Sequence, residues 1–329
     1  MERIIQQTDY DALSSKICAL QFNYLPPNKG TLSESIDDTL QCLYSDIKSL
    51  HFEYYKTLKE KSRNVYGKIN KLMRNPFPVM NYGTYLRTLA IDVSLIKYIE
   101  NFPKDQPFQI VNLGSGSDLR FIQYLKMYGG RIKRFVDLDF KDAIILKQSI
   151  LKDSTNLDQS IRSFEGKYVI LQGDLKDVEG TLQQLKQYLD PKLPTVFITE
   201  CVLCYMTEND SKQLISTIMD TFATGFWISY DPIGGADVND KFGTIMKRNL
   251  MDSRNLEMPT LLIYNSKLNY PQRWENEKSQ IDIKDMWNFL SEAISDTEKR
   301  RLRSLQFLDE IEELKIMQSH YVILNTAWD

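Results

Sequence analysis

Residue types that usually hold metals or cross-links are scarce in this sequence. Its 329 residues include 4 cysteines and 2 histidines. Four cysteines in so long a chain do not make a disulfide framework, so we expect a reduced, intracellular setting. The histidines, His51 and His320, lie far apart and outside any cluster with metal-ligand spacing. No metal site is therefore predicted.

Two of the cysteines, Cys201 and Cys204, form a C-x-x-C motif, for which a redox or metal role has to be weighed. The other two, Cys18 and Cys42, are distant in the sequence. Free cysteine is commonly a small, buried, apolar residue. We therefore interpret the motif as part of the core beside a strand.

Neither an excess of positive charge nor a long apolar run is present. The formal net charge is −3, so no overall positive field favours nucleic acid or an acidic membrane surface. No apolar run approaches the roughly 18 residues of a membrane-spanning helix. Residues 1–7 lack the apolar core of a secretory signal. We expect a cytoplasmic monomer, with the nucleus as a second compartment, that binds neither membranes nor nucleic acid.

The residues that are present predict a folded protein with a helical first third. The composition is 42% hydrophobic and 26% charged, which is typical of globular proteins. Apolar residues at helical spacing occur over 36–72 and again over 85–99, and the N-P-F-P segment at 75–78 interrupts them. We predict that residues 1–105 form a helical extension packed on a core of residues 106–329, within one compact domain.

From residue 107 onward, short apolar runs alternate with helical patterns. The predicted strands are 108–113, 134–139, 168–171, 195–199 and 226–230, with a last strand at 320–324. The clearest helix begins at Thr207, where T-x-x-D resembles a capping signal. A single amphipathic helix is predicted from Leu305, Leu308, Ile311 and Leu314. Such alternation favours an α/β fold with a mostly parallel sheet that is covered on both faces.

A glycine-rich turn follows the first predicted strand, in the segment V-N-L-G-S-G-S-D that contains Gly114 and Gly116. Glycine at this place lets the backbone approach a nucleotide-like ligand closely. A dinucleotide fingerprint would need a third glycine where Leu119 stands. S-adenosylmethionine has no pyrophosphate, so the missing glycine disfavours NAD without disfavouring this methyl donor.

Acidic residues follow the next three predicted strands. Asp139 is placed to accept both hydroxyls of a ribose, as acids in nucleotide-binding α/β folds do. Asp174 is placed to accept the adenine amino group, with the backbone N–H of Leu175 beside it for a ring nitrogen. Glu200 ends the fourth strand near the expected switch in strand order. These acids and the glycines together predict an adenosyl pocket at the carboxyl ends of the strands.

Several segments resemble the leucine carboxyl methyltransferase family. They are NYGTYLRT at 81–88, VNLGSGSDLR at 111–120, TVFITECVLCYM at 195–206 and RSLQFLDEIEE at 303–313. The resemblance implies the Rossmann-like fold of class I S-adenosylmethionine-dependent methyltransferases, with a mostly parallel seven-stranded sheet, an N-terminal helical region and helical inserts. It also implies S-adenosylmethionine as donor and S-adenosylhomocysteine as product. The implied acceptor is the C-terminal leucine α-carboxylate of the protein phosphatase 2A catalytic subunit.

The resemblance further implies roles for individual residues. Lys16 and Arg87 match the cations that hold the methionine carboxylate of the donor. Asn112 stands where the common methyltransferase pattern has an acid. From their positions in the sequence, we expect Tyr205, and Tyr82 from the opposite side, to contact the acceptor, with a buried core position as the alternative for each tyrosine. We expect the insert at 232–260 to shape the acceptor channel. The remaining donor-binding positions of the family fall on Gly114, Asp139, Asp174, Leu175 and Glu200.

No general base is expected in such a site. An α-carboxyl group has a pKa of about 3.3–3.7 and is already ionised at neutral pH. Three alternatives stay open at this stage: a carboxyl methyltransferase for a modified tRNA base, an NAD-dependent dehydrogenase, and a non-catalytic protein that binds the phosphatase. The tRNA enzymes usually carry an additional propeller region for which this chain has no length, and the predicted donor contacts argue against a non-catalytic protein.

Overall fold

A seven-stranded sheet forms the centre of the molecule, with the strand order β3-β2-β1-β4-β5-β7-β6. The computed structural model describes residues 2–32, 36–74, 77–164, 166–237, 239–274, 279–309 and 311–329. β7 runs antiparallel to β5 and β6, and the other pairings are parallel. The strands are β1 (Phe108–Leu113), β2 (Ile132–Asp139), β3 (Tyr168–Gln172), β4 (Thr195–Glu200), β5 (Gly225–Pro232), β6 (Gln280–Asp285) and β7 (Tyr321–Trp328).

The strand order reverses between β1 and β4, which are adjacent although β2 and β3 lie between them in sequence. Ligands of open α/β sheets bind at the carboxyl ends of the strands beside such a reversal. The mostly parallel sheet predicted from the sequence is confirmed. β6 was not predicted; its residues alternate between exposed and partly buried, as on an edge strand, and give no apolar run.

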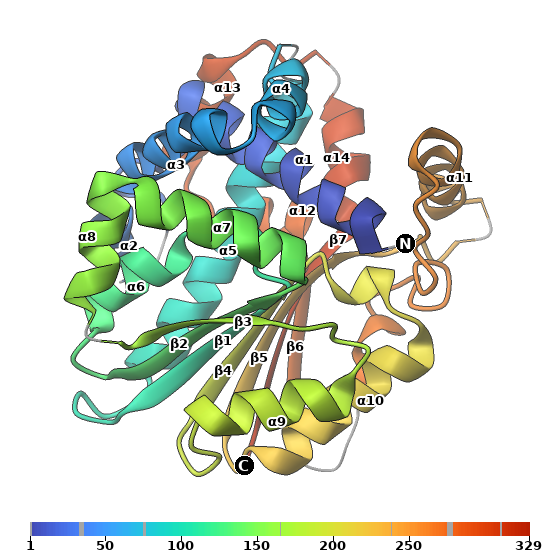
Figure 1. Cartoon of the computed structure of the whole chain (residues 1–329). Helices are drawn as coiled ribbons and strands as arrows, with labels where there is room; N and C mark the ends of the chain where they lie inside the picture. The colour runs from blue at the N-terminus through green and yellow to red at the C-terminus, as the bar shows by residue number, and fades with distance from the viewer. Residues whose placement is uncertain are drawn as a thin grey trace.

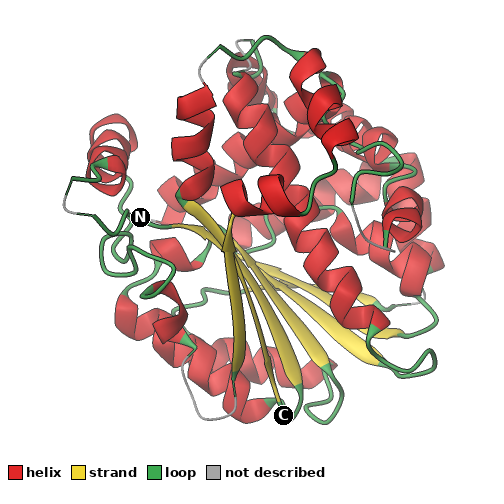
Figure 2. Cartoon of the chain, turned by 180° about the vertical axis from the view of Figure 1, so that it is seen from behind, coloured by secondary structure: helices red, strands yellow, loops and turns green. Residues whose placement is uncertain are grey.

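Helices cover both faces of the sheet, as Figures 1 and 2 show from opposite sides. All six residues of β1 are buried, because each face of this central strand is covered. Alternate side chains enter separate hydrophobic clusters: Ile110 packs with the N-terminal helices, and Val111 packs with residues of α9 and α10. One face carries α9 (Val178–Tyr188) and α10 (Glu208–Thr221); the other carries α5 (Pro78–Glu100), α6 (Arg120–Tyr128), α7 (Lys141–Asp153) and α12 (Met286–Glu292).

The N-terminal helices share one hydrophobic cluster with the sheet. Ile17, Leu86 and Ile323 all belong to it, although they come from opposite ends of the chain. The segment predicted as helical over 36–72 contains three helices, α2 (Asp37–Leu43), α3 (Ile47–Lys61) and α4 (Arg63–Leu72), and α1 (Glu2–Gln21) precedes them. Ser62 ends α3 and caps α4 by accepting from the Val65 N–H at 3.4 Å.

Two sequence predictions meet different outcomes at helix ends. The cap at Thr207 is confirmed, since its hydroxyl accepts from the Asp210 N–H at 3.1 Å. Of the predicted helix breaker at 75–78, residues 75 and 76 lie outside the described residues, and Pro78 is the first residue of α5. The division of the chain after residue 105 stays a prediction.

The single helix predicted across Leu305–Leu314 is wrong. α13 (Asp296–Leu305) ends where Gln306 becomes extended, and α14 (Ile311–Ser319) follows, so that Leu308 lies between them. Gln306 is held there because its side-chain oxygen accepts from Asn81 on α5 at 2.7 Å. Helical spacing of apolar residues does not reveal such an interruption.

The remaining elements are α8 (Thr155–Ser163), α11 (Phe242–Arg254) and the 3-10 turns η1 (Leu203–Tyr205) and η2 (Tyr270–Arg273). α11 belongs to the insert after β5, and the N-terminus of the chain lies beside this insert in Figure 1. Over the described residues, no helix is both long and apolar enough to cross a membrane.

Candidate active site

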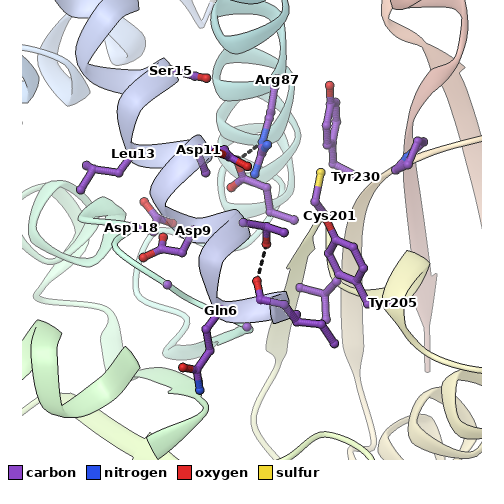
Figure 3. Close-up of a pocket in the computed structure, with 18 of the residues that line it drawn as sticks. Gln6, Asp9, Asp11, Leu13, Ser15, Arg87, Asp118, Cys201, Tyr205 and Tyr230 are labelled. Carbon is purple, nitrogen blue, oxygen red and sulfur yellow. Dashed lines mark hydrogen bonds and ion pairs between the residues drawn. The ribbon is translucent and has the colours of Figure 1, made fainter. Parts of the chain in front are cut away.

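A cavity of about 510 Å³ opens at the carboxyl ends of the central strands. The turn after β1 and the ends of β2, β3 and β4 form its floor, while α1, α5 and the α11 insert enclose its sides. Figure 3 shows α1 crossing the cavity, with Gln6, Asp9 and Asp11 along it. The volume lies in the range of roughly 300–1,000 Å³ that small-molecule sites occupy.

The turn after β1 needs glycine at two positions. Gly114 and Gly116 have φ angles of +71° and +45°, in the left-handed region that side chains disfavour. A Cβ atom on Gly114 would lie 2.6 Å from the Cγ2 atom of Val202, and one on Gly116 would meet the Asp9 carboxylate. The backbone N–H of Gly116 donates to Asp139 at 2.6 Å. The turn is thereby tied to the end of β2.

Asp139 is the acid that the sequence assigns to a ribose. Burial raises its pKa to about 6, although the N–H groups of Gly116 and Phe140 stabilise its anion. Asp174 and Leu175 line the same cavity at the end of β3. Asp174 is exposed and accepts from the Lys176 N–H at 3.0 Å, which fixes its carboxylate at the rim. These residues therefore line the cavity together at the ends of β2 and β3.

Glu200 lies at the centre of a cluster of charges at the other end of the cavity. Its carboxylate pairs with Arg87 on α5 and lies 3.4 Å from the guanidinium of Arg120. Burial alone would raise the pKa of Glu200. The positive charges of Arg87, Arg120 and Lys16 outweigh burial and lower the pKa of this carboxyl to about 2. Glu200 is therefore an anion at every physiological pH.

The predicted cations lie beside Glu200. The Arg87 guanidinium is also 5.4 Å from the centre of the Tyr230 ring, and both side chains face the cavity in Figure 3. Lys16 reaches the cavity from α1 and donates to the Thr88 hydroxyl on α5. Burial lowers the pKa of Lys16, while Glu200 counteracts this effect. Two helices far apart in sequence thus bring cations to one carboxylate.

Sequence reasoning missed the buried support of this cluster. Arg120 is only 3% exposed; its Nε donates to Asp92 at 2.7 Å, and it also pairs with Asp118. Tyr44 donates a further hydrogen bond of 2.6 Å to Asp92. Asn112, which stands where an acid was expected, donates to Asp118 at 3.0 Å. The sequence signal that could have identified Arg120 is its place in the segment D-L-R at 118–120, directly after the glycine turn.

Asp9 on α1 is a second residue that the sequence did not indicate. Its carboxylate accepts from the backbone N–H of Ser117 at 2.8 Å and from the Ser117 hydroxyl at 2.7 Å. These bonds attach α1 to the turn after Gly116. A carboxylate in a helical segment 108 residues away carries no local pattern that predicts this contact.

Tyr205 lies on the side of the cavity that the insert covers. Burial raises the pKa of its phenol well above the usual range. Around it, Cys204, Leu256, Met258 and Leu261 form a small hydrophobic cluster with partly buried residues of α1 and α11. Many cavity-lining residues of the insert are apolar, including Met246, Leu250, Leu256 and Met258. This side can therefore receive an apolar group.

The C-x-x-C motif borders the same compartment. Both Cys201 and Cys204 are free thiols, and burial raises the pKa of each. Cys201 has a φ of +57°, which brings strained backbone directly after Glu200 into the cavity wall. Among the described residues, no group of three or more His, Cys, Asp or Glu side chains is placed to hold a metal.

Tyr82 does not line the cavity, so of its two expected places it occupies the buried core position and not one beside the acceptor. It is buried, and its ring packs edge-on against Tyr24 with the centroids 5.4 Å apart. Tyr82 lies on α5, one to two turns before Arg87, and faces the helical layer. Its place in a cavity-forming helix did not determine which face it occupies. The other predicted site residues all line the cavity: Lys16, Arg87, Gly114, Gly116, Asp139, Asp174, Leu175, Glu200 and Tyr205.

Comparisons with known proteins find one family repeatedly. A family model described as leucine carboxyl methyltransferase matches residues 37–219. Leucine carboxyl methyltransferase 1 of Kluyveromyces lactis is 42% identical, over 100% of this chain and 99% of its own length. The protein of the same name from Eremothecium gossypii is 41% identical over the whole of both chains. That from Schizosaccharomyces pombe is 30% identical, over 90% of this chain and 94% of its own.

Solved structures extend the agreement to the fold. A protein of Thermobifida fusca assigned to the methyltransferases superposes with a TM-score of 0.53, at 10% identity, over 84% of this chain and 93% of its own. A protein of the DUF574 family from Streptomyces avermitilis gives 0.51 at 12% identity, over 85% and 90%. The fold is that of the class I S-adenosylmethionine-dependent methyltransferases.

Proposed function

Because this chain belongs to the leucine carboxyl methyltransferase family, we propose that it methylates the C-terminal leucine α-carboxylate of the protein phosphatase 2A catalytic subunit. The donor in this proposal is S-adenosylmethionine. One observation carries the proposal: a single cavity contains both Asp139, an acid at the end of β2 that suits a ribose, and the cluster of charges around Glu200 at the end of β4. The family name supports a leucine carboxyl group as the acceptor group, and the cavity supports the donor.

The charges of the cavity match the parts of the donor. The Asp139 carboxylate accepts hydrogen bonds from the ribose hydroxyls. The Asp174 carboxylate accepts one from the adenine amino group, and the Leu175 N–H donates one to a ring nitrogen. Arg87 and Lys16 bind the methionine carboxylate, and Glu200 binds the ammonium group. Arg87 and Glu200 pair with each other in the structure. When the donor binds, its carboxylate and ammonium groups replace this ion pair, so each of the two side chains keeps a partner of opposite charge. Arg120 holds Glu200 in position during this exchange.

The protein contributes alignment and a dry environment to the reaction. The donor supplies a methyl group on a positively charged sulfur, and the acceptor carboxylate attacks the methyl carbon. An α-carboxyl group with a pKa of about 3.3–3.7 needs no base to ionise it. Holding both reactants in line can supply on the order of 7–11 kcal/mol. Because the reaction neutralises an anion and a cation, the apolar walls around Tyr205 favour it.

A transfer experiment tests acceptor and bond type together. The protein is incubated with S-adenosylmethionine labelled in the methyl group and with the phosphatase catalytic subunit, either intact or lacking its terminal leucine. We expect label on the intact subunit alone, released by mild base as expected for an ester. Label on both forms, or label that resists base, would refute the proposal. Total tRNA serves as the competing acceptor in a parallel reaction.

A further inference from the structure

An ion pair joins two segments that cover the cavity. Arg254 at the end of α11 pairs with Asp11 on α1, 243 residues away in sequence; one Nη2–Oδ1 distance is 3.4 Å, and Nη1 is closer to the other oxygen. Both residues line the cavity, and their side chains are 39% and 35% exposed. The pair therefore lies at the opening, where solvent reaches it, and connects the N-terminal helix to the insert.

The position of Arg254 separates it from the other cations of the cavity. Among the described residues, the lysines and arginines that line the cavity are Lys16, Arg87, Lys176 and Arg254. Lys16 and Arg87 lie at Glu200, and Lys176 follows the adenine-facing segment at β3. Arg254 is close enough to Tyr205 to interact with it electrostatically. It is the cation on the acceptor side, next to the apolar cluster of Tyr205, Leu256 and Met258.

The partner of Arg254 can be exchanged at little cost. Half-exposed ion pairs add little net stability, because water screens the charges and two long side chains must be held in one geometry. A guanidinium binds any carboxylate with the same two-pronged geometry. A carboxylate that enters from solvent can therefore replace Asp11 with little loss of protein stability, and the burial of its apolar side chain in the cluster offsets the entropy cost of its association.

We propose that Arg254 recognises the free carboxylate of the acceptor by exchanging Asp11 for it. The inference rests on the proposed function and deepens it. One carboxylate oxygen stays on the guanidinium while the other forms the bond to the methyl carbon; the carbon–sulfur bond breaks, and its electron pair stays on sulfur. The ester that results is neutral. Asp11 then regains Arg254, so the exchange favours release of the product over release of the substrate.

The test compares binding of substrate and product. The unmethylated and the methylated phosphatase catalytic subunit are titrated into the protein with S-adenosylhomocysteine present, so that no turnover occurs. We expect the wild type to bind the free carboxylate about tenfold more tightly than the ester, the size of one charge-assisted hydrogen bond. Arg254→Gln should bring this ratio close to one and leave the affinity for S-adenosylhomocysteine unchanged.

Two further variants make the result decisive. Arg248→Gln removes an exposed arginine from the same helix, and it should keep the wild-type ratio. Asp11→Asn removes the competing carboxylate, and it should tighten binding of the unmethylated subunit severalfold. An unchanged ratio in Arg254→Gln, or weaker binding in Asp11→Asn, would overturn the exchange. Methylation by the wild type is measured separately, so failure of the proposed function is recognised by itself.

Discussion

Replacing Arg87 with alanine removes a guanidinium that lies between Glu200 and the face of Tyr230. In the proposed complex this group turns to the methionine carboxylate of the donor. A hydrogen bond to a charged group contributes about 1.5–3 kcal/mol. Since about 1.4 kcal/mol corresponds to a factor of ten, the affinity for S-adenosylmethionine should fall by roughly tenfold to a hundredfold.

Two features of the structure bear on that magnitude. Lys16 lines the cavity and interacts with Glu200, so in the proposed complex a second cation faces the donor's carboxylate, and binding should be weakened and not abolished. Arg120 still pairs with Glu200 after the substitution, so this carboxylate keeps a buried partner and the fold should persist. The turnover number at saturating donor should change less than the affinity, because in the proposed complex Arg87 contacts the amino-acid end of the donor and not the reacting atoms.

Calorimetric titration of the donor into purified protein measures this effect directly. Arg162→Ala is the matched control, because Arg162 also pairs with a carboxylate, that of Asp158, but is 77% exposed on α8. The control should bind the donor like the wild type. Unchanged affinity in Arg87→Ala, in a protein whose thermal unfolding is cooperative, would remove Arg87 from the donor site and refute the reasoning.

Further predictions concern pH, the buried charges and the glycine turn. Burial raises the pKa of Asp139 to about 6, and this carboxyl must be ionised to accept hydrogen bonds from both ribose hydroxyls. Donor affinity measured by calorimetry should therefore be constant above pH 7 and fall about tenfold per pH unit below pH 6. Affinity that is constant down to pH 5 would contradict this role. Arg120→Met leaves the buried Asp92 without its cation, so the free energy of unfolding in urea should fall by roughly 3–5 kcal/mol. The double variant with Asp92→Asn removes the unpaired charge and should recover part of this stability. Equal stability of the single and double variants would show that the pair is not coupled. Gly114→Ala forces a side chain to a φ of +71° and against Val202, so it should cost about 1–2 kcal/mol of stability and weaken donor binding; a variant as stable as the wild type would show that the turn relaxes.

Much of the fold was predictable because its signals are local. β1, β2, β4 and β5 are mostly buried and appear as short apolar runs. β3 also appears as an apolar run, although as an edge strand it is only partly buried. The cap at Thr207 marks the start of α10 correctly. β6 gave no such signal, because an edge strand with exposed alternate residues needs no apolar run. The helix predicted across Leu305–Leu314 is absent because the backbone becomes extended at Gln306. The side chain of Gln306 bonds there to Asn81, more than two hundred residues away, and local sequence does not reveal such a contact.

The candidate site likewise contains residues that local sequence predicts and residues that it does not. Gly114, Asp139, Asp174 and Glu200 follow successive strands, so their meeting at one edge follows from a parallel sheet. Arg87 and Lys16 were placed by resemblance and not by any local pattern. Tyr82 shares a helix with Arg87 but occupies another face, where it packs on Tyr24. Resemblance identified a segment correctly without determining the direction of each side chain.

The sequence by itself determined the parallel strands of the sheet, the glycine turn and the acids at the strand ends, because each depends on residues that are close together in the chain. Only the tertiary structure determined which charges meet across long sequence distances: Arg120 with Asp92 and Glu200, Asp9 with Ser117, and Arg254 with Asp11. A buried or bridging charge is specified by the group that neutralises it. That group comes from another element, and its position exists only after the helices have packed on the sheet.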